Sequence, residues 1–564
     1  MWLHNILPVA TLGLRKLVGR TTALLRRHSD FAQRELALYQ AIETRLTQST
    51  EPARASRFEG LLLLPPAPVV RQALATEADY RMIDPRQQNV ADTEFLHRHG
   101  LERSLLLENT DAIAHEPGQR SRKAKRSTGA TAFQREALAA RALEARCPLT
   151  GQRLRSDRSF IAEQNQPIFY FFRAQQPFFI AVGREGRGYI KLYLYFPAWR
   201  TAILLADPTR WHGRDEIDQL RAHLIAEQRH VGRYLARTDP ARVCALVDNR
   251  QFAHYIWNVL SGIEWLINEG HLAHIDKLVI AAEPIGRLES IFPEIKNVLI
   301  ERAHFPSVID AGLNGNWFLL RPGGICVSDN LIERVHRCAE LNTPRRLRME
   351  IARIKKDRWP IVCVTLRMGN RTWVSQVQGI IAIGLALAKD SPRAAMIIDG
   401  FSRLHGPSSP PSREHEQLIA GELAAVETIR QAIGHLLPIY TSIGQPIDHS
   451  FSYTRIIDCY LAHHGSLQHK VGWLSGTPGV VHSNSLVLST PDLWEPALKV
   501  RPDAPRPIYL NASDVRDVPG ARRVSKNRWL DDLDNYEMDP MAAYRPLRRI
   551  IEQLRLSAAA DGLS

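Results

Sequence analysis

Residues 461–482 read Leu461-Ala-His463-His464-Gly465-Ser466-Leu-Gln-His469-Lys470-Val-Gly-Trp473-Leu-Ser-Gly-Thr-Pro478-Gly479-Val-Val-His482. This order predicts a buried strand, a Gly-Ser turn, a short helix, a Pro-Gly turn and a second strand. Polar and basic side chains crowd the point where the first strand becomes the helix, and a helix start offers unpaired N–H groups and the positive end of the helix dipole. The segment therefore suits a phosphate group carried on a small molecule. The alternative is an ordinary strand-to-helix turn whose histidines are solvated.

Short apolar strands alternate with helical stretches on both sides of this segment, which is typical of parallel sheets covered by helices. A first set of strands is predicted at Val243–Val247, Leu278–Ala281, Val298–Ile300 and Ile325–Val327. A second set is predicted at Ile361–Leu366, Ala395–Ile398, Ile439–Thr441, Cys459–Ala462 and Val480–Val481. Two such units in series imply a cleft between them, and open sheets of this kind bind ligands beyond the carboxyl ends of their strands.

The predicted fold class is α/β, with two Rossmann-like domains, a helical N-terminal region and a β-meander. Aromatic and β-branched runs predict the meander at 167–172, 178–182, 189–196 and 202–205. An Ala- and Arg-rich stretch predicts a helix over Thr131–Arg146. The predicted regions are a helical region with a basic linker (1–150), the meander (151–240), a first Rossmann-like domain (241–345), a second one (346–500) and a helical tail (501–564).

Composition indicates a folded protein with an anionic partner. The chain has 564 residues, of which 45% are hydrophobic and 23% charged, and its net charge is +14. The dense basic run at 120–126 lies among Gly, Ser and Pro, which is typical of a solvated linker and does not favour nucleic-acid binding. Six cysteines without a Cys-x-x-Cys pair argue against a zinc knuckle and suit a reducing cytoplasm.

The N-terminus has a short apolar stretch, which is not long enough to span a bilayer. Basic residues follow among leucines from Arg15 to Arg27. We expect either a basic amphipathic helix lying on an anionic membrane surface or a helix packed on its own domain. The expected location is the cytoplasm, with peripheral contact at the inner membrane in the first case.

A histidine helix follows the first strand of the first set: Val247-Asp-Asn249-Arg-Gln-Phe252-Ala-His254-Tyr-Ile-Trp-Asn258. His254 and Asn258 share a polar face near the helix start, and a histidine there could take a proton from a sugar hydroxyl. The alternative is a capping or packing histidine.

Two arginines follow the first strand of the second set: Ile361-Val-Cys-Val-Thr-Leu-Arg367-Met-Gly-Asn-Arg371-Thr-Trp373. A diphosphate would satisfy both guanidinium groups through paired hydrogen bonds. The alternative is a pair of solvated loop arginines.

Taken in order, these three segments resemble glycosyltransferase family 61 and related sugar transferases with two Rossmann-like domains (the GT-B type). The matching pieces are Asn249…His254-Tyr255, Thr365-Leu-Arg367…Arg371, and His464-Gly465-Ser466-Leu467 followed by Pro478-Gly479-Val480. The resemblance covers roughly residues 240–500. This chain has Asn258 where the family often carries an acidic residue, Ser466-Leu467 in place of Ala-Gly, and Gln376 or Gln378 in place of a glutamate.

The resemblance implies transfer of a sugar from a nucleotide-sugar donor to a glycan acceptor, with inversion, without an obligatory metal and without a cofactor. Its implied acceptor is a bacterial surface polysaccharide. The donor diphosphate would be held by residues of the second domain, namely Arg367, Arg371, His464, Gly465, Ser466 and Lys470. His254 is the candidate general base with Asn258 beside it, and the base stays open between His254 and a residue not identified. The alternatives are a non-catalytic protein that binds anionic glycan and a nucleic-acid-binding protein.

Overall fold

A computed structural model describes ten ranges of the chain, namely 80–87, 89–109, 132–183, 191–205, 215–305, 307–324, 326–405, 413–489, 504–518 and 534–561. The expected N-terminal amphipathic helix and the basic run at 120–126 lie outside these residues. Within the described ranges, no helix combines the length and the apolar character that crossing a bilayer requires.

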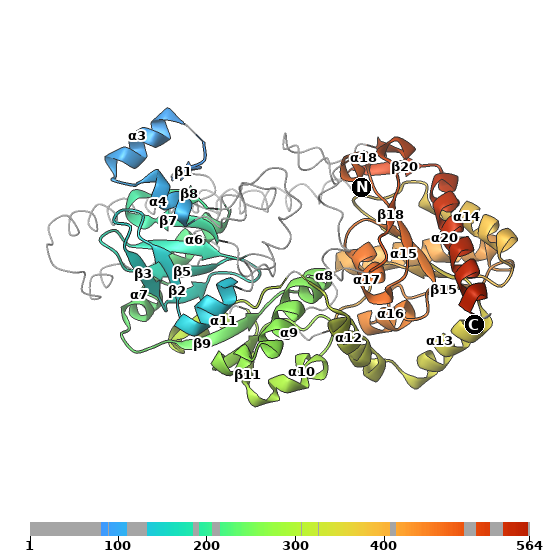
Figure 1. Ribbon diagram of the computed structural model, residues 1–564, viewed down its shortest axis with the longest axis horizontal. Helices are drawn as coiled ribbons and strands as arrows, with labels where there is room; N and C mark the ends of the chain where they lie inside the picture. The colour runs from blue at the N-terminus through green and yellow to red at the C-terminus, as the bar shows by residue number, and fades with distance from the viewer. Residues whose placement is uncertain are drawn as a thin grey trace, which may run out of the picture.

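A mixed six-stranded sheet precedes the two parallel units (Figure 1). Its strand order is β1-β8-β7-β6-β5-β4, and every pairing is antiparallel except that of β1 with β8. The strands are β1 (Arg81–Ile83), β4 (Ser159–Ile161), β5 (Ile168–Phe172), β6 (Phe178–Val182), β7 (Lys191–Phe196) and β8 (Thr201–Leu204). The four predicted meander strands are confirmed. Alternate residues of β5 enter two different cores, because successive side chains of a strand point to opposite faces.

The region predicted as helical before residue 150 is mixed. Helices α3 (Val90–Arg98) and α4 (Arg103–Glu108) are present, and residues 132–140 are helical. The helix predicted over Thr131–Arg146 is wrong in its second half, where β2 (Leu143–Arg146) pairs with β3 (Arg153–Ser156). Alternate burial along β2 gives the reason, since a two-residue period decides against the helix that its alanines favour.

The first parallel sheet has the order β11-β10-β9-β12. Its strands are β9 (Arg242–Val247), β10 (Lys277–Ile280), β11 (Leu299–Arg302) and β12 (Trp317–Leu320). Its helical elements are α8 (Phe252–His254), the π-helix η4 (Tyr255–Leu260), α9 (Ser261–Asn268), α10 (Leu288–Ile291), α11 (Ser307–Asn314) and α12 (Asp329–Asn342). The strand predicted at Ile325–Val327 is not found at its described residues, Cys326 and Val327. The fourth strand ends earlier, because the sequence Arg321-Pro-Gly-Gly interrupts the ladder directly after Leu320.

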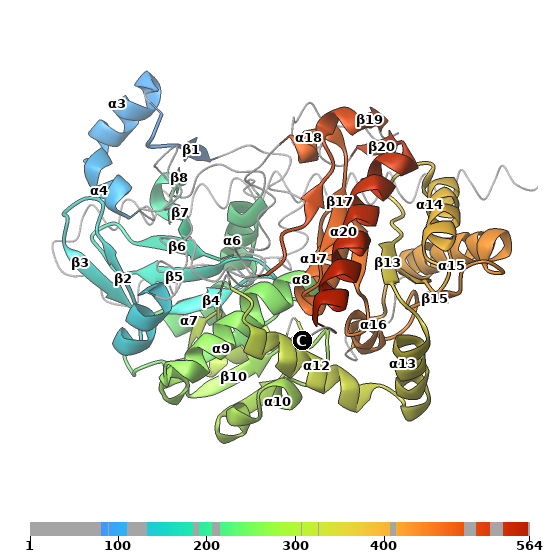
Figure 2. The ribbon, with the colours of Figure 1, turned by 45° about the vertical axis from the view of Figure 1, so that its right-hand side comes forward.

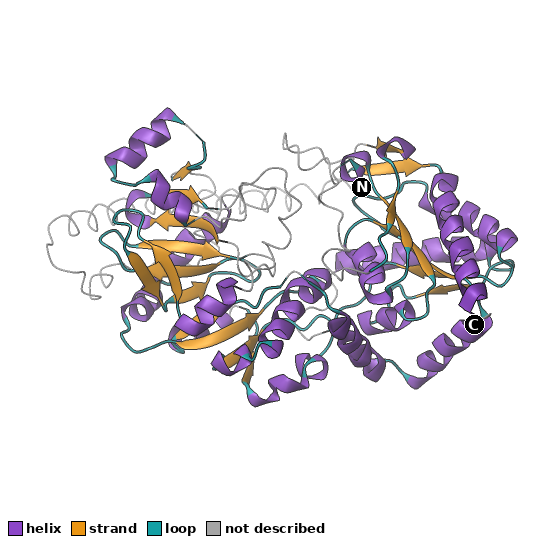
Figure 3. Cartoon of the chain, in the orientation of Figure 1, coloured by secondary structure: helices purple, strands orange, loops and turns teal. Residues whose placement is uncertain are grey.

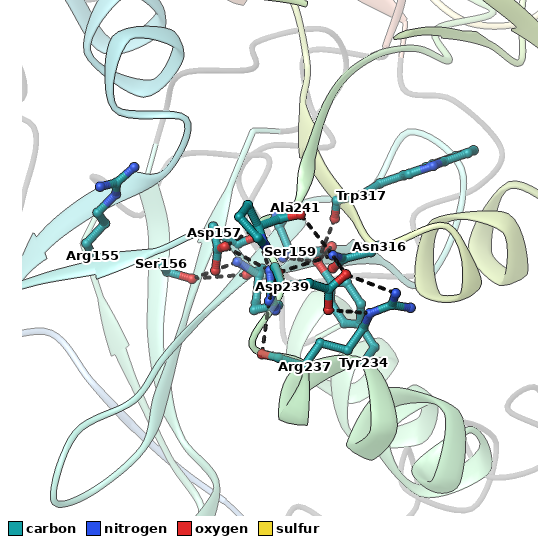
Figure 4. Close-up of polar contacts among 12 residues, drawn as sticks. Arg155, Ser156, Asp157, Ser159, Tyr234, Arg237, Asp239, Ala241, Asn316 and Trp317 are labelled. Atoms are coloured by element: carbon teal, nitrogen blue, oxygen red, sulfur yellow. Dashed lines mark hydrogen bonds and ion pairs between the residues drawn. The ribbon is translucent and has the colours of Figure 1, made fainter. Parts of the chain in front are cut away.

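Polar contacts join the mixed sheet to the first parallel sheet (Figure 4). The hydroxyl of Tyr234, on α7 (Gln228–Ala236), lies 2.9 and 2.6 Å from backbone oxygens of Ser159 and Trp317, to which its single proton can be donated, and accepts from the N–H of Ser159 at 2.7 Å. Asn316 donates to Asp239, which also pairs with Arg237. These contacts fix β4 beside β12 at the edge of the parallel sheet.

The second parallel sheet has six strands in the order β15-β14-β13-β16-β17-β18. They are β13 (Ile361–Thr365), β14 (Ala395–Asp399), β15 (Ile439–Thr441), β16 (Cys459–His463), β17 (Gly479–His482) and β18 (Ile508–Tyr509). The five strands predicted here are confirmed, and β18 was not predicted. The covering helices are α13 (Arg345–Asp357), α14 (Gln376–Asp390), α15 (Arg413–Ile433), α16 (Ile447–Thr454), α17 (Ser466–Ser475), α18 (Ser485–Leu488) and α20 (Pro540–Asp561).

The region predicted as a helical tail contains strands as well as a helix. A two-stranded antiparallel ribbon, β19 (Val515–Val518) with β20 (Asn535–Met538), precedes α20. Helix α20 packs on α14, β16 and β17, so the end of the described chain belongs to the second parallel unit (Figure 2). The predicted fold class is confirmed: two parallel α/β units in series, with an additional sheet that is mainly antiparallel (Figure 3).

Candidate functional site

The chain reverses its direction of strand addition once in each parallel sheet. In the first sheet β10 and β11 extend to one side of β9 and β12 is added on the other side; in the second, β14 and β15 extend to one side of β13 and β16 on the other. Ligands of open α/β sheets bind at such switch points, beyond the carboxyl ends of the strands. The predicted site residues follow β9, β13 and β16, so they lie at the two switch points.

The loop after β13 holds Arg367 in a turn. Its Nε donates to the backbone oxygen of Asn370 and one Nη donates to the Asn370 side-chain oxygen, both at 2.7 Å. Gln376 bonds to both the N–H and the oxygen of Arg367, at 3.2 and 3.0 Å. Gly369 and Arg371 adopt positive φ values of 98° and 52°, which let the loop turn back sharply.

Gly465 connects β16 to α17 directly below this loop. Its φ of 115° and ψ of −146° suit glycine, and a Cβ at this position would lie 3.5 Å from an Nη of Arg367 and 4.0 Å from an Nη of Arg371. The structure therefore brings Arg367, Arg371 and Gly465 together at the start of a ten-residue helix. The first N–H groups of that helix have no helical partners, so they add to the positive potential of the two guanidinium groups.

The two arginines form a like-charged pair. Burial and the neighbouring Arg371 both lower the pKa of Arg367. Among the described residues, Arg367 makes no ion pair with a carboxylate, and its side-chain hydrogen bonds go to the neutral Asn370. A bound anion would remove this repulsion and accept hydrogen bonds from both side chains.

His464 and Ser466 lie beside the same helix start, and both are half-buried. The backbone N–H of His464 donates to the oxygen of His482 at 2.9 Å, which extends the pairing of β16 with β17 by one residue. Ser466 is the first residue of α17. Five of the six residues predicted to hold a diphosphate thus lie at or beside the start of α17.

Lys470 is the exception. It is 1% exposed, and its ammonium group bonds to the Asp399 carboxylate at 2.8 Å, the Gly400 oxygen at 3.2 Å and the Ser402 hydroxyl at 3.2 Å. These three partners use the three N–H bonds of the ammonium group. Lys470 points into the protein because the fifth residue of α17 lies on the buried side of the helix, and sequence position alone could not distinguish the two sides.

A buried aromatic cluster below the arginines was not predicted as part of the site. The His463 and His482 rings lie 4.4 Å apart, and the hydroxyl of Tyr536 is 2.6 Å from Nδ1 of His482. Nδ1 of His463 is 3.1 Å from the hydroxyl of Thr365. Burial lowers the pKa of His482 to about 3 and that of His463 well below its usual range, so both rings are neutral at neutral pH. The signal in the sequence was His482 at the end of a predicted strand, next in register to His463.

At the first switch point, His254 ends α8 and Asn258 lies on the π-helix. Nδ1 of His254 is 2.8 Å from Oδ1 of Asn258, while Nδ2 of Asn258 donates to the Gly324 oxygen at 2.7 Å. Because its amide group is engaged by Gly324, Asn258 presents an acceptor to the histidine. In the neutral form of His254 this contact places the ring proton on Nδ1.

A buried ion pair at this switch point was also missed. Asp248 follows β9 and Arg321 follows β12, and two parallel hydrogen bonds of 2.9 and 2.8 Å join them. Both side chains are fully buried, and Arg321 also donates to Gln166 of the mixed sheet at 2.9 Å. This arginine is neutralised within the protein, unlike Arg367.

The two switch points face each other through α8 and α17, which are in contact (Figure 2). The ammonium group of Lys470 lies 6.0 Å from the centre of the Phe252 ring, and the rings of Trp257 and Trp473 are 6.3 Å apart. The histidine helix of the first unit is therefore adjacent to α17, the helix whose start lies beside the arginine pair.

Two other features lie away from these switch points. A surface hollow of about 490 Å³ lies at the amino end of β11, lined by Glu289, Lys296, Asn297, Val298, Leu299 and Ile300. Among the residues that the structure describes, one group could hold a metal ion, namely Glu227, His230 and Asp310. The last two are exposed, and the group is on the mixed-sheet side of the molecule.

Comparisons of the whole chain with known proteins find distant similarity to solved structures. No protein-family model and no curated protein matches it. Among solved structures, it is similar to a family 9 glycosyl transferase from Veillonella parvula, with a TM-score of 0.27, 8% identity and coverage of 49% of this chain and 87% of that one. It is also similar to a chain of a GtfA/B complex, with a TM-score of 0.18, 11% identity and coverage of 72% and 80%.

Proposed function

We propose that this protein is a glycosyltransferase that takes its sugar from a nucleotide-sugar donor, as the resemblance to glycosyltransferase family 61 implies. One observation carries the proposal: Arg367 and Arg371 converge on Gly465 at the start of α17, at the switch point of the second sheet. The diphosphate of a sugar nucleotide carries two negative charges and spreads its acceptor oxygens over two phosphate groups. It can therefore be bound by both guanidinium groups and the helix start at once.

In this function the second parallel unit, residues 346–500 together with the ribbon and α20, holds the donor. Arg367, Arg371, His464 and Ser466 contact the diphosphate, and Gly465 leaves room for it. When the bond between the sugar carbon and the diphosphate oxygen breaks, negative charge grows on that oxygen. The fixed guanidinium and N–H groups stabilise this charge without an additional cation.

Lys470 acts as a positioning residue in this scheme. Its ion pair with Asp399 ties α17 to the end of β14, and Leu366 donates to the oxygen of the same aspartate at 2.7 Å. The loop that begins at Leu366 and the helix that begins at Ser466 are thus fastened to one residue. Their spacing sets the distance between the arginines and the helix start.

His254 supplies the base. Its Nε2 takes the proton of the acceptor hydroxyl while the hydroxyl oxygen attacks the sugar carbon from the side opposite to the diphosphate. One carbon–oxygen bond forms as another breaks, and the configuration at that carbon inverts. Asn258 keeps the proton on Nδ1 and so keeps Nε2 basic. The acceptor is a glycan, with a growing bacterial surface polysaccharide as the implied class.

The test is calorimetric titration with inorganic pyrophosphate, nucleoside diphosphates and a panel of sugar nucleotides. We expect one nucleotide class to bind, and Arg367→Ala and Arg371→Ala each to weaken it about ten- to a hundredfold, since each removes charged hydrogen bonds worth roughly 1.5–3 kcal/mol. Arg353→Ala is the matched control, because Arg353 is an exposed arginine on α13. His254→Ala should keep the affinity and abolish transfer.

Equal weakening by Arg353→Ala would indicate general charge attraction and contradict the proposal. Equal binding of every polyanion, including heparin and single-stranded DNA, would also contradict the proposal. That result is expected of a protein that binds anionic glycan or nucleic acid.

A further inference from the structure

The loop that carries the two arginines is held by a segment more than 160 residues later in the chain. The N–H of Thr372 donates to the side-chain oxygen of Asn535 at 2.9 Å, across 163 residues. Tyr536 donates its N–H to the oxygen of Thr372 at 3.0 Å and accepts from the N–H of Val374 at 2.9 Å. The carboxylate of Glu537 accepts from the N–H of Ser375 at 3.3 Å and from its hydroxyl group.

Three of the four loop residues 372–375, namely Thr372, Val374 and Ser375, are thus bonded to three consecutive residues of β20. Trp373 and Tyr536 form a parallel bridge, so β20 adds one step of sheet pairing to the loop. Arg371 directly precedes the bridged stretch and has a positive φ of 52°. A non-glycine residue in this conformation costs about 1 kcal/mol or more, and the surrounding bonds must hold it there.

Tyr536 also reaches the other side of the site. Its ring is fully buried, and its hydroxyl contacts His482 at the end of β17, which is in register with His463 at the end of β16. Tyr536 therefore connects three elements. Its backbone bonds to the loop after β13, and its side chain packs at the ends of β16 and β17. Those are the elements that bring Arg367, Arg371 and Gly465 together.

We infer that β20 is the positioning element of the anion site, with Asn535, Tyr536 and Glu537 as positioning residues that set the place of Arg371 without touching the ligand. The inference rests on the proposed function for the identity of the anion, a diphosphate. These bonds hold only the loop. Their loss should therefore loosen the loop and weaken anion binding while the rest of the protein stays folded.

The experiment compares Asn535→Ala and Tyr536→Phe with the wild type by two measurements. The first is hydrogen exchange of the amides in residues 368–375, which needs no ligand. The second is calorimetric titration with inorganic pyrophosphate. Tyr536→Phe keeps the buried ring and removes only the hydroxyl, so that the variant folds even if larger changes do not. Asn511→Ala is the matched control, because Asn511 lies in the same part of the chain and bonds to Asp514 rather than to the arginine loop.

We expect Asn535→Ala to speed exchange at Thr372 and its neighbours about tenfold and to weaken pyrophosphate binding by a similar factor, the equivalent of one lost hydrogen bond of roughly 1 kcal/mol or slightly more. Tyr536→Phe should weaken binding severalfold. Asn511→Ala should leave both measurements at the wild-type values.

The possible failures are distinct. If the wild type and Arg367→Ala respond to pyrophosphate alike, the proposed function is wrong, and the exchange data still judge the role of β20 in holding the loop. If Arg367→Ala loses binding while Asn535→Ala and Tyr536→Phe keep both wild-type exchange and wild-type affinity, the positioning role of β20 is overturned and the diphosphate site remains.

Discussion

The two switch points share one topology but differ in whether their arginines are neutralised by a carboxylate. At the first, Arg321 is neutralised by Asp248 in a fully buried ion pair. At the second, Arg367 and Arg371 lie side by side, and among the described residues no carboxylate pairs with Arg367. The same strand order thus supports one arginine that is neutralised inside the protein and, at the second switch point, two neighbouring arginines of like charge.

In the proposed function this difference gives each unit a separate task. The first unit supplies His254, held by Asn258 at 2.8 Å, as the base. The second supplies the positive charge that holds the leaving diphosphate. Stability and ligand response should therefore separate cleanly between variants of the two switch points.

The largest expected effect is a loss of folding stability on changing the ion pair at the first switch point. Asp248→Ala leaves the Arg321 guanidinium buried without its partner, and we expect the free energy of unfolding to fall by about 3–5 kcal/mol. Denaturant unfolding monitored by tryptophan fluorescence measures this loss. The double variant Asp248→Asn with Arg321→Met should recover part of the loss, because no charge then stays buried. Equal losses in the single and double variants would contradict a role for charge pairing.

The buried histidines of the second switch point should make stability depend on pH. The pKa of each ring is depressed in the folded state, so the unfolded chain binds protons first as the pH falls below about 6.5. Their stabilising contribution is complete above pH 6.5 and is lost as the pH falls toward the folded-state pKa, about 3 for His482. Between pH 7 and pH 5, His482→Gln should lose roughly 2 kcal/mol less stability than the wild type. Parallel curves for the two proteins would show that His482 is not buried in its neutral form.

A smaller effect is expected on the ionisation of His254. Asn258→Asp places a carboxylate beside Nδ1 of His254, where the neutral oxygen now lies at 2.8 Å. The pKa of His254 should rise by about one unit or more. Nuclear magnetic resonance of selectively labelled histidine measures the shift, and Asn268→Asp, at the end of α9, serves as the control. An unchanged titration would contradict the contact between the two side chains.

The smallest expected effect is on the stability of the second switch point. Arg367→Ala removes two hydrogen bonds to Asn370 and also relieves the repulsion from Arg371. These opposing terms should leave the unfolding free energy without ligand within about 1 kcal/mol of the wild type. A loss as large as that of Asp248→Ala would mean that Arg367 serves the fold, as Arg321 does.

Strand-to-helix alternation predicted nearly all of the second parallel sheet, because fully buried strands read as unbroken apolar runs. The same reasoning placed the fourth strand of the first sheet too late, at Ile325–Val327 rather than Trp317–Leu320. Apolar runs on both sides of the Pro-Gly-Gly break satisfy the pattern equally well. Only the pairing with β9 shows which of the two runs is the strand. That pairing joins residues far apart in the sequence, so the local pattern does not reveal it.

The proximity of the candidate residues was predictable where they lie directly at strand ends. Arg367, Arg371 and Gly465 were placed correctly at one sheet edge because parallel strands bring their carboxyl ends together. Lys470 was misjudged because its partner, Asp399, ends a different strand. Tyr536 and Asn535 could not be found from the sequence, since their bonds to the loop cross more than 160 residues, as the 163-residue separation of Asn535 from Thr372 shows.

The π-helix between His254 and α9 has a further consequence. Its wide turn, Tyr255–Leu260, inserts an additional residue relative to an α-helix, in which each residue advances by about 100°. The short segment that carries His254 is thereby rotated with respect to the apolar stripe of α9. Deleting one residue from this turn would restore a regular helix and rotate the imidazole by about a quarter of a revolution or slightly more. The orientation of the imidazole is thus set by one surplus residue in the backbone, independently of the packing that buries the rest of the helix.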